Sequence, residues 1–185
     1  MSPGSDSLWA PWRGEYVRGD AGSPGECLFC RAASDRSHDR ENLVLFRREG
    51  CMVLLNRFPY INGHLMIAPE RHVGYFAGLS GDELRAMTGL IVLAESALRR
   101  GMRAEGMNGG WNLGRCAGAG VEGHLHVHLL PRWSGDTNFL TTVAGTRVIS
   151  ESLEESYDLL GPLLSSGEAA GGGEPPGEPP PREAP

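Results

Sequence analysis

The chain has 185 residues and a formal net charge of −6, from 17 Lys and Arg against 23 Asp and Glu. This mild acidic excess provides no basic surface for a nucleic acid polymer, and no apolar run reaches the roughly 18–20 residues needed to cross a bilayer. The first residues also lack the basic and apolar segments of a signal peptide. We therefore expect a cytoplasmic protein with no nucleic acid partner and no membrane partner.

Composition divides the chain into one domain and two flexible ends. The last 21 residues, 165–185, hold 5 of the 27 Gly and 6 of the 13 Pro, together with 4 Glu. Such a segment cannot bury enough apolar area to offset the conformational entropy of the chain, which predicts a disordered tail. Residues 1–7 predict a flexible N-terminus, and residues 8–164 are long enough for one domain with a hydrophobic core.

Two short apolar runs, Cys51–Leu55 and His64–Ala68, are joined by the connector Asn56–Gly63. The connector contains Pro59 and ends in an Asn-Gly pair, which is a strong turn signal. The pattern predicts two adjacent antiparallel strands, with a further strand over Val44–Phe46 before them.

The clearest helix is predicted over Ser80–Arg100. Ser80 and Glu83 have the spacing of a capping box, and Gly101 supplies a C-terminal stop. A second, shorter helix is predicted near Ser150–Leu164. In the long helix, apolar side chains recur every three or four residues and form one stripe that packs on a sheet: Leu84, Met87, Ile91, Ala94 and Leu98.

Gly109–Gly123 starts like a strand and becomes a glycine-rich loop, and His124–Pro131 is predicted to be the next strand. Strands and helices do not alternate in the βαβ manner of a parallel sheet. The order favours an α+β fold, in which an antiparallel sheet packs against one long helix and a C-terminal helix.

Half of the six histidines lie at alternate positions of that last strand, at His124, His126 and His128. Successive side chains of a strand point to opposite faces, so all three imidazoles share one face. A solvated polar face and a metal site made by all three imidazoles are the alternatives to a catalytic cluster. The core side of the strand is then made by Leu125, Val127 and Leu129.

The run His-Leu-His-Val-His-Leu-Leu at 124–130 resembles the signature of the histidine triad (HIT) family, His-φ-His-φ-His-φ-φ, in which φ is apolar. Leu54–His72 resembles the ribose-binding region of HIT nucleotide hydrolases. Trp111–Phe139 and Leu8–Tyr16 are similar to the bacterial branch that includes diadenosine tetraphosphate phosphorylases. The resemblance spans about residues 8–164 and implies a HIT-like fold and a homodimer.

The resemblance implies an enzyme that cleaves a dinucleoside polyphosphate at its α-phosphate, as a hydrolase or as a phosphorylase. His126 matches the nucleophile that forms a nucleotidyl-histidine, and neutral imidazole is a competent nucleophile near pH 7 because its ordinary pKa is about 6.5. His128 matches the residue that contacts the leaving oxygen, and His64 matches an auxiliary histidine. The presence of His128 argues against the uridylyltransferase branch, which has Gln there.

The same resemblance implies a small-molecule nucleotide site formed by Asn56, Asn112, Gly118, Gly120 and Trp133. Glycine lets backbone N–H groups approach phosphate oxygens closely, which suits a chain with little positive charge. Asn56 and Trp133 also have simpler interpretations, as a turn former and as an aromatic at the edge of the core. Gly120 stands where many family members carry a hydroxyl residue, which leaves the substrate and the acceptor open.

Cys27 and Cys30 form a C-x-x-C pair, which is typical of a metal knuckle or a redox pair and also arises by chance. Cys51 and Cys116 have no spaced partner and are expected to be small packed side chains. Two thiolates and two imidazoles suit a closed tetrahedral zinc site. Some HIT relatives bind structural zinc with such a pair, a histidine ending a Pro-x-x-His segment and the first triad histidine, which here are Cys27, Cys30, His72 and His124.

Two other functions stay open at this point. A nucleoside phosphoramidate or acyl-nucleotide hydrolase uses the same intermediate. A zinc-stabilised nucleotide-binding protein keeps the fold with negligible turnover. The intact triad favours an enzyme.

Overall fold

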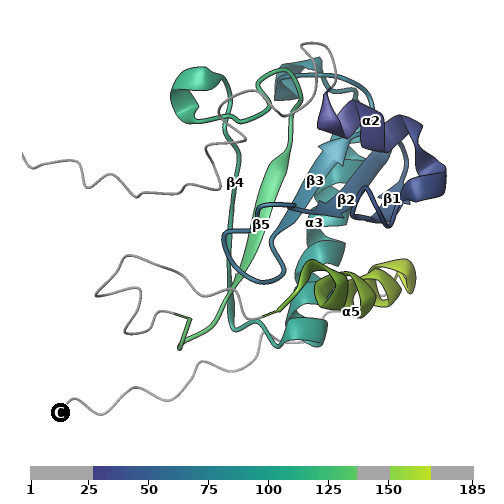
Figure 1. The fold of residues 1–185 in the computed structure, drawn as a ribbon. Coiled ribbons are helices and arrows are strands. Elements are labelled where there is room, and N and C mark those ends of the chain that lie inside the picture. Colours follow the sequence, from purple (N-terminus) through teal and green to yellow (C-terminus); the bar gives the residue numbers. More distant parts are fainter. Residues whose placement is uncertain (1–26, 137–150, 168–185) are drawn as a thin grey trace, which may run out of the picture.

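The computed structural model describes residues 27–136 and 151–167 (Figure 1). The predicted flexible N-terminus at 1–7 and most of the predicted tail at 165–185 lie outside these residues. The described elements, in chain order, are α2 (Leu28–Ser34), the 3₁₀ turn η1 (Arg36–His38), β1 (Val44–Arg48), β2 (Cys51–Leu55), β3 (Leu65–Pro69), the 3₁₀ turn η2 (Phe76–Gly78), α3 (Gly81–Met102), β4 (Gly106–Gly110), the 3₁₀ turn η3 (Arg115–Ala117), β5 (Val127–Arg132) and α5 (Leu153–Ser165).

The strands form one five-stranded sheet in the order β1-β2-β3-β5-β4, and each neighbouring pair is antiparallel. β2 and β3 pair over their whole length, from Cys51 opposite Pro69 to Leu55 opposite Leu65. This confirms the predicted pair of adjacent antiparallel strands and the α+β fold.

One face of the sheet carries the larger hydrophobic core. α3 and α5 pack on this face, and Figure 1 shows α3 passing behind the strands. Every second residue of β2 and β3 points into this core, because side chains alternate along a strand. The three apolar residues between and after the triad histidines join it as predicted: Leu125, Val127 and Leu129.

The opposite face carries a smaller core beneath α2. Phe29 and Ala32 of α2 pack there with Val44 and with the remaining alternate residues of β2 and β3. Both faces of these two strands are therefore covered, which is why they are apolar at every position. Since α2 has only 7 residues, it is too short to be stable alone, and its place depends on these contacts.

The N-terminus of α3 confirms the predicted capping box. Ser80 Oγ accepts a hydrogen bond from Glu83 N–H at 3.1 Å, and a Glu83 carboxylate oxygen accepts one from Ser80 N–H at 2.7 Å. The predicted stop at Gly101 is wrong, because the helix runs past it to Met102 and is capped by Arg103, whose φ is +52°. Gly101 serves packing instead, since a Cβ there would lie 2.7 Å from Leu163 Cδ1 of α5.

The buried stripe of α3 differs from the predicted one. Leu84 is 49% exposed and Ile91 is only half-buried, whereas Leu90 and Leu93 are fully buried. The helix is therefore turned so that these two leucines face the sheet. The other predicted members are buried as expected: Met87, Ala94 and Leu98.

Two strands begin at other residues than predicted. β4 spans Gly106–Gly110, so the strand predicted at the start of Gly109–Gly123 is confirmed but begins three residues earlier. β5 begins at Val127, after two of the three histidines. The cause is that Leu125 N–H donates to the backbone carbonyl of Val73 at 2.7 Å, outside the strand ladder.

The predicted C-terminal helix is confirmed as α5, which packs against α3 and β1. It begins at Leu153 and not at Ser150, because Ser152 and Glu155 form a second capping box just before it. Among the helices of residues 27–136 and 151–167, none has the length and apolarity that a bilayer crossing requires.

Candidate functional site

The catalytic candidates His64, His126 and His128 lie together where β3 and β5 run side by side. His128 is in β5 opposite Met66 of β3, and His64 immediately precedes β3. The ring centroids of His126 and His128 are 4.9 Å apart, and those of His64 and His128 are 5.1 Å apart. The structure brings residues from two distant segments into one cluster.

A hydrogen bond fixes which nitrogen of His126 is free. Its Nδ1 lies 2.8 Å from the backbone carbonyl oxygen of His124. Because a carbonyl oxygen only accepts, Nδ1 carries the proton and Nε2 keeps a lone pair. Burial lowers the pKa of His126 below its ordinary 6.5, so the imidazole is neutral near pH 7. A neutral imidazole with a free Nε2 is able to act as a nucleophile.

A chain of hydrogen bonds fixes the tautomer of His128. The backbone N–H of Tyr60 donates to His64 Nδ1 at 3.2 Å, so the proton of a neutral His64 sits on Nε2. His64 Nε2–H then donates to His128 Nδ1 at 2.9 Å, which leaves His128 with a proton on Nε2. Desolvation is the main cause that lowers the pKa of His64 to about 3 and the pKa of His128 to about 4, so both rings are neutral near pH 7. His128 therefore presents a neutral N–H donor.

Asn56 shapes the turn before His64. Its Oδ1 accepts a hydrogen bond from Phe58 N–H at 2.9 Å, and its Nδ2 lies 3.3 Å from His64 Nδ1. The turn-forming interpretation of Asn56 is therefore confirmed, and the same side chain lies beside the histidine cluster. A contact with ribose stays a prediction.

The glycine-rich loop leaves the sheet beside the histidines. Gly110, the last residue of β4, pairs with His128 of β5, and Asn112 follows two positions later. The loop ends just before His124, the first histidine of the triad. The sheet therefore places the first end of the loop next to the cluster, and the second end, Gly123, precedes His126 by three residues.

Inside this loop, Gly118 has φ +83°, and its N–H donates to the backbone carbonyl of Arg115 at 2.9 Å. Its amide is thus used by the turn of the loop. Gly120 is exposed. Cys116 is also exposed, so the expectation that it packs in the core is wrong, because its 3₁₀ turn lies on the surface of the loop.

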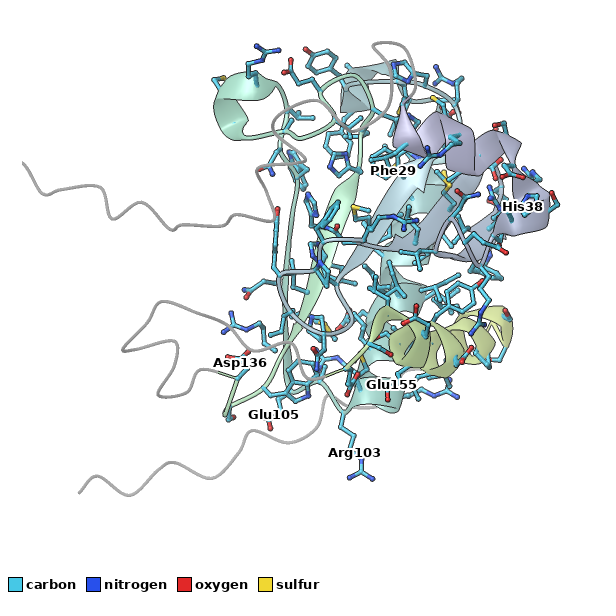
Figure 2. All side chains as sticks on the ribbon, viewed as in Figure 1. Phe29, His38, Arg103, Glu105, Asp136 and Glu155 are labelled. Atoms are coloured by element: carbon cyan, nitrogen blue, oxygen red, sulfur yellow. The ribbon has the colours of Figure 1, made fainter. Side chains whose placement is uncertain are left out.

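Trp133 lies at the other end of β5. Its Nε1–H donates to the backbone carbonyl of Met102 at 3.0 Å, and its ring packs against the larger core. Figure 2 shows Glu105 and Asp136 at this end of the molecule, well away from Phe29. The structure does not bring Trp133 to the histidine cluster of its own chain, and its role beside a substrate stays a prediction.

The metal candidates Cys27, Cys30, His72 and His124 form one cluster, in which the ligand atoms all lie within 4.8 Å of one another. Cys27 Sγ is 3.2 Å from His124 Nδ1, and Cys30 Sγ is 3.1 Å from His72 Nδ1.

In the part of the chain that the structure describes, no group of possible metal ligands contains all three triad histidines. The alternative of a three-histidine metal site is therefore wrong for these residues. The solvated face is wrong too, since His124 is buried.

The donor chemistry of this cluster fits a tetrahedral cation of zinc type. His124 Nε2–H donates to the backbone carbonyl of Pro69 at 2.8 Å, which leaves its Nδ1 lone pair directed at the sulfurs. Burial, followed by the neighbouring Cys27 sulfur, raises the pKa of the Cys30 thiol to about 11. Two adjacent thiolates at neutral pH therefore require a nearby cation.

Two side chains that the sequence did not single out lie beside these centres: Phe29, which is buried, and Arg47, which is partly buried. Phe29 packs its ring against His126 at a centroid distance of 4.8 Å. Arg47 of β1 donates to a backbone carbonyl of α2 at 2.7 Å and to the Glu70 carboxylate, beside the loop of His72, at 2.8 Å. The signal for Phe29 was its place inside C-x-x-C, whereas Arg47 is an ordinary strand arginine in the sequence.

Comparison with known proteins points to one family. Over 158 residues the chain is 35% identical to an AP-4-A phosphorylase of Mycobacterium tuberculosis, which covers 83% of this chain and 81% of that protein. A Zn-bound histidine triad family protein of Mycobacterium smegmatis superposes with a TM-score of 0.58 at 26% identity, over 76% of this chain and 94% of that one. A hypothetical histidine triad nucleotide-binding protein of Sulfolobus tokodaii gives 0.57 at 26% identity, over 76% and 91%. The HIT domain profile matches residues 38–135, and the chain belongs to the HIT family.

Proposed function

We propose that this chain is a nucleotidyl-transferring enzyme that cleaves dinucleoside polyphosphates of the diadenosine tetraphosphate type at an α-phosphorus. The nucleotidyl group is carried on His126. The observation that carries the proposal is the hydrogen bond from His126 Nδ1–H to the carbonyl of His124, because it leaves Nε2 free to attack. The 35% identity to an AP-4-A phosphorylase supports this substrate class.

In the first half-reaction, Nε2 of His126 attacks the α-phosphorus. An N–P bond forms, the bond from phosphorus to the bridging oxygen breaks, and the rest of the polyphosphate leaves with that electron pair. His128 donates a hydrogen bond from Nε2–H to the departing oxygen, since its Nδ1 already accepts from His64. A donor placed where charge develops in the transition state speeds such a step.

His64 acts through His128 in this proposal and does not touch the nucleotide. Its Nδ1 accepts a hydrogen bond from the backbone N–H of Tyr60, and its Nε2–H donates a hydrogen bond to His128 Nδ1. It is therefore a positioning residue that keeps His128 in the donor tautomer.

In the second half-reaction, an acceptor oxygen attacks the same phosphorus, the N–P bond breaks, and its electron pair returns to Nε2 of His126. Inorganic phosphate as the acceptor yields ADP, whereas water yields AMP and releases a proton. The chain has Gly120 in place of the hydroxyl residue of many family members, so the loop backbone, His128 or solvent holds the acceptor. The similarity to a phosphorylase favours phosphate.

We propose that the nucleotide is held by neutral groups. Asn56 Oδ1 has a second lone pair for a ribose hydroxyl, because only one is used by Phe58 N–H. Asn112 and Gly120 hold phosphate oxygens, while Gly118 contributes its left-handed turn and not its amide. Neutral donors suit a chain with a net charge of −6.

We propose that Cys27, Cys30, His72 and His124 bind a structural zinc ion. The chemistry of the donor set supports this, and the similar protein of Mycobacterium smegmatis is Zn-bound. Two thiolates and two imidazoles fill a tetrahedral shell and leave no position for a substrate. When bound, zinc supplies a cross-link between the start of α2 and the two loops that carry His72 and His124.

We also propose a homodimer. β4 is an edge strand of the sheet, and the outer N–H and C=O groups of an edge strand are able to pair with a second copy. Size-exclusion chromatography with light scattering tests this, and the mass of a single chain at micromolar concentration would refute it.

The decisive experiment is incubation with diadenosine tetraphosphate, with and without inorganic phosphate, followed by identification of the products. ADP with ATP only in the presence of phosphate identifies a phosphorylase, and AMP with ATP identifies a hydrolase. Nucleoside phosphoramidates and acyl-nucleotides are assayed in parallel. Binding of AMP without turnover of any of these substrates would leave a nucleotide-binding protein and would sink the proposal.

A further inference from the structure

Phe29 lies between the metal cluster and the nucleophile. Its side chain is 1% exposed, and Figure 2 shows it between α2 and the strands. The centroid of its ring is 5.0 Å from that of His124, with the planes inclined by 37°, and 4.8 Å from that of His126, with the planes inclined by 32°. One ring therefore packs against a metal candidate and against the nucleophile.

The place of Phe29 depends on the two cysteines that flank it. Cys27 is the N-cap of α2 and makes no side-chain capping hydrogen bond, and the helix has only 7 residues. A helix of about two turns without a side-chain cap has little stability of its own. The contacts of Cys27 with His124 and of Cys30 with His72 therefore hold the first turn of α2, and with it Phe29, on the sheet.

His126 needs more than its one hydrogen bond to hold a single orientation. The bond from Nδ1–H to the carbonyl of His124 fixes one edge of the ring. The second torsion of a histidine side chain has a broad minimum, so a hydrogen bond at one edge still allows the ring to tilt. His128 packs on the ring at 76° with a centroid distance of 4.9 Å, and Phe29 supplies a further contact.

We propose that Phe29 is a positioning residue that couples the metal site to the nucleophile. The metal site holds the ring of Phe29 against His126, and this contact keeps Nε2 in the direction of the α-phosphorus. Without the ring, His126 samples other orientations, and fewer molecules are ready to attack. The inference rests on the proposed nucleotidyl transfer to His126.

The first test measures formation of nucleotidyl-histidine in single-turnover experiments on the zinc-loaded chain. The variants are Phe29→Ala and Phe29→Leu, and the matched control is Leu28→Ala, at the other position between the two cysteines. We expect Phe29→Ala to slow the step by about 10–100-fold, as removal of a supporting contact does at other metal sites. We expect Phe29→Leu to slow it by less and Leu28→Ala to leave it within about twofold. We expect the dissociation constant of AMP for the zinc-loaded chain to stay unchanged in Leu28→Ala and to rise in the Phe29 variants by no more than about fivefold, which is the size of the coupling between AMP and zinc.

The second test reads the coupling without turnover. Zinc affinity is measured by competition with a chromogenic chelator, with and without saturating AMP. By reciprocity, a nucleotide that orders His126 against Phe29 also tightens the metal site. We expect AMP to raise zinc affinity by about fivefold in the unchanged chain and in Leu28→Ala, and by less than about twofold in both Phe29 variants.

Nitrogen NMR of the imidazoles adds a spectroscopic signature. We expect His126 to be the Nδ1–H tautomer in the unchanged chain and a mixture of tautomers in Phe29→Leu. The NMR measurement does not depend on turnover, so it tests the role of Phe29 even if the unchanged chain forms no nucleotidyl-histidine. Absence of the intermediate in the unchanged chain would contradict only the proposed function.

Three results overturn the inference. The first is that Phe29→Leu forms the intermediate at the unchanged rate. The second is that Phe29→Leu keeps the full effect of AMP on zinc affinity. The third is that Phe29→Leu changes only the affinity for AMP. The last result would place Phe29 on the nucleotide-binding surface. If Phe29→Ala does not fold, Phe29→Leu carries all three readings.

Discussion

The two faces of the sheet are stabilised in different ways. Beneath α3 and α5, 19 buried apolar residues form a continuous core. Beneath α2 the apolar cluster has 7 buried residues and is supplemented by buried imidazoles, the cysteine-histidine cluster and the Arg47 ion pairs. The same strands β2 and β3 contribute to both faces.

The difference shows how the fold separates stability from chemistry. Apolar packing is non-directional and contributes stability in proportion to the area buried, which suits the face without reactive groups. Polar groups must each be matched to a partner, and this is what sets the tautomers of His126 and His128 on the other face. Substitutions beneath α3 and α5 should therefore change stability alone, whereas substitutions beneath α2 should change turnover or zinc content.

The largest expected effect is a loss of turnover, caused by a substitution on the face beneath α2, here called the reactive face because it carries the histidines. We expect His126→Ala to lower turnover of diadenosine tetraphosphate by about 10⁴-fold or more, because it removes the nucleophile. The free energy of unfolding should change by less than about 2 kcal/mol. Steady-state kinetics and urea unfolding measure the two. Turnover within tenfold of the unchanged chain would contradict the assignment of His126.

Removal of the metal comes next. Because the proposed zinc ion would bind the folded chain and not the unfolded one, stripping it with a strong chelator is expected to lower the free energy of unfolding by roughly 4 kcal/mol. Elemental analysis should give about one zinc per chain before treatment. Cys30→Ser should lose this zinc, and Cys116→Ser, at the exposed cysteine, should keep it. Equal zinc content in the two variants would refute the ligand set.

On the apolar face, Leu98→Ala should affect stability alone. Leu98 is 0% exposed in the larger core, and such truncations cost about 2–5 kcal/mol through lost transfer energy and a cavity. We expect zinc content and the rate of the folded fraction to stay unchanged. A loss of zinc in this variant would show that the two faces are not separable.

Acidic pH should weaken the reactive face. The pKa of His64 is lowered to about 3 by burial, whereas the unfolded chain has the ordinary value of 6.5. Below pH 6.5 the unfolded state binds more protons, so the free energy of unfolding falls as the pH drops toward 3 and gains nothing from this group above 6.5. The slope is up to about 1.4 kcal/mol per pH unit. Urea unfolding between pH 7 and pH 5 should show a shallower slope for His64→Gln, and an identical slope would contradict the shift.

The smallest effect is expected at a helix cap. Ser80→Ala removes the capping box of α3 and should cost about 1 kcal/mol of unfolding free energy, without changing zinc content or activity. Ser152→Ala at α5 is the matched comparison, because its capping box has the same form. Thermal unfolding of both variants measures the cost, and a change in zinc content would contradict a purely local role.

Elements with a local cause were predictable. The capping box at Ser80 was predicted from its Ser-x-x-Glu spacing, and β2 and β3 from apolar runs around an Asn-Gly turn. The same spacing at Ser152 was not used for the C-terminal helix, whose start was therefore predicted near Ser150 instead of Leu153. The stop at Gly101 failed because its cause is not local: glycine is there to let α5 approach, at a distance that only the packed helices define. The start of β5 failed for a similar reason, since Leu125 pairs with Val73, far away in sequence.

By itself, the sequence determined the α+β class, the resemblance to the HIT family and the list of histidines and cysteines, because these depend on residue type and spacing. Only the tertiary structure decided which nitrogen of each imidazole carries a proton, through the carbonyls of His124 and Pro69 and the amide of Tyr60. It also placed Phe29 against His126 and Trp133 at the far end of β5. The contacts of Phe29 with His126 and of His124 with Pro69 join segments that are distant in sequence. The bonds of His126 to His124 and of Tyr60 to His64 are local in sequence, but they depend on backbone and ring orientations that residue type and spacing do not encode.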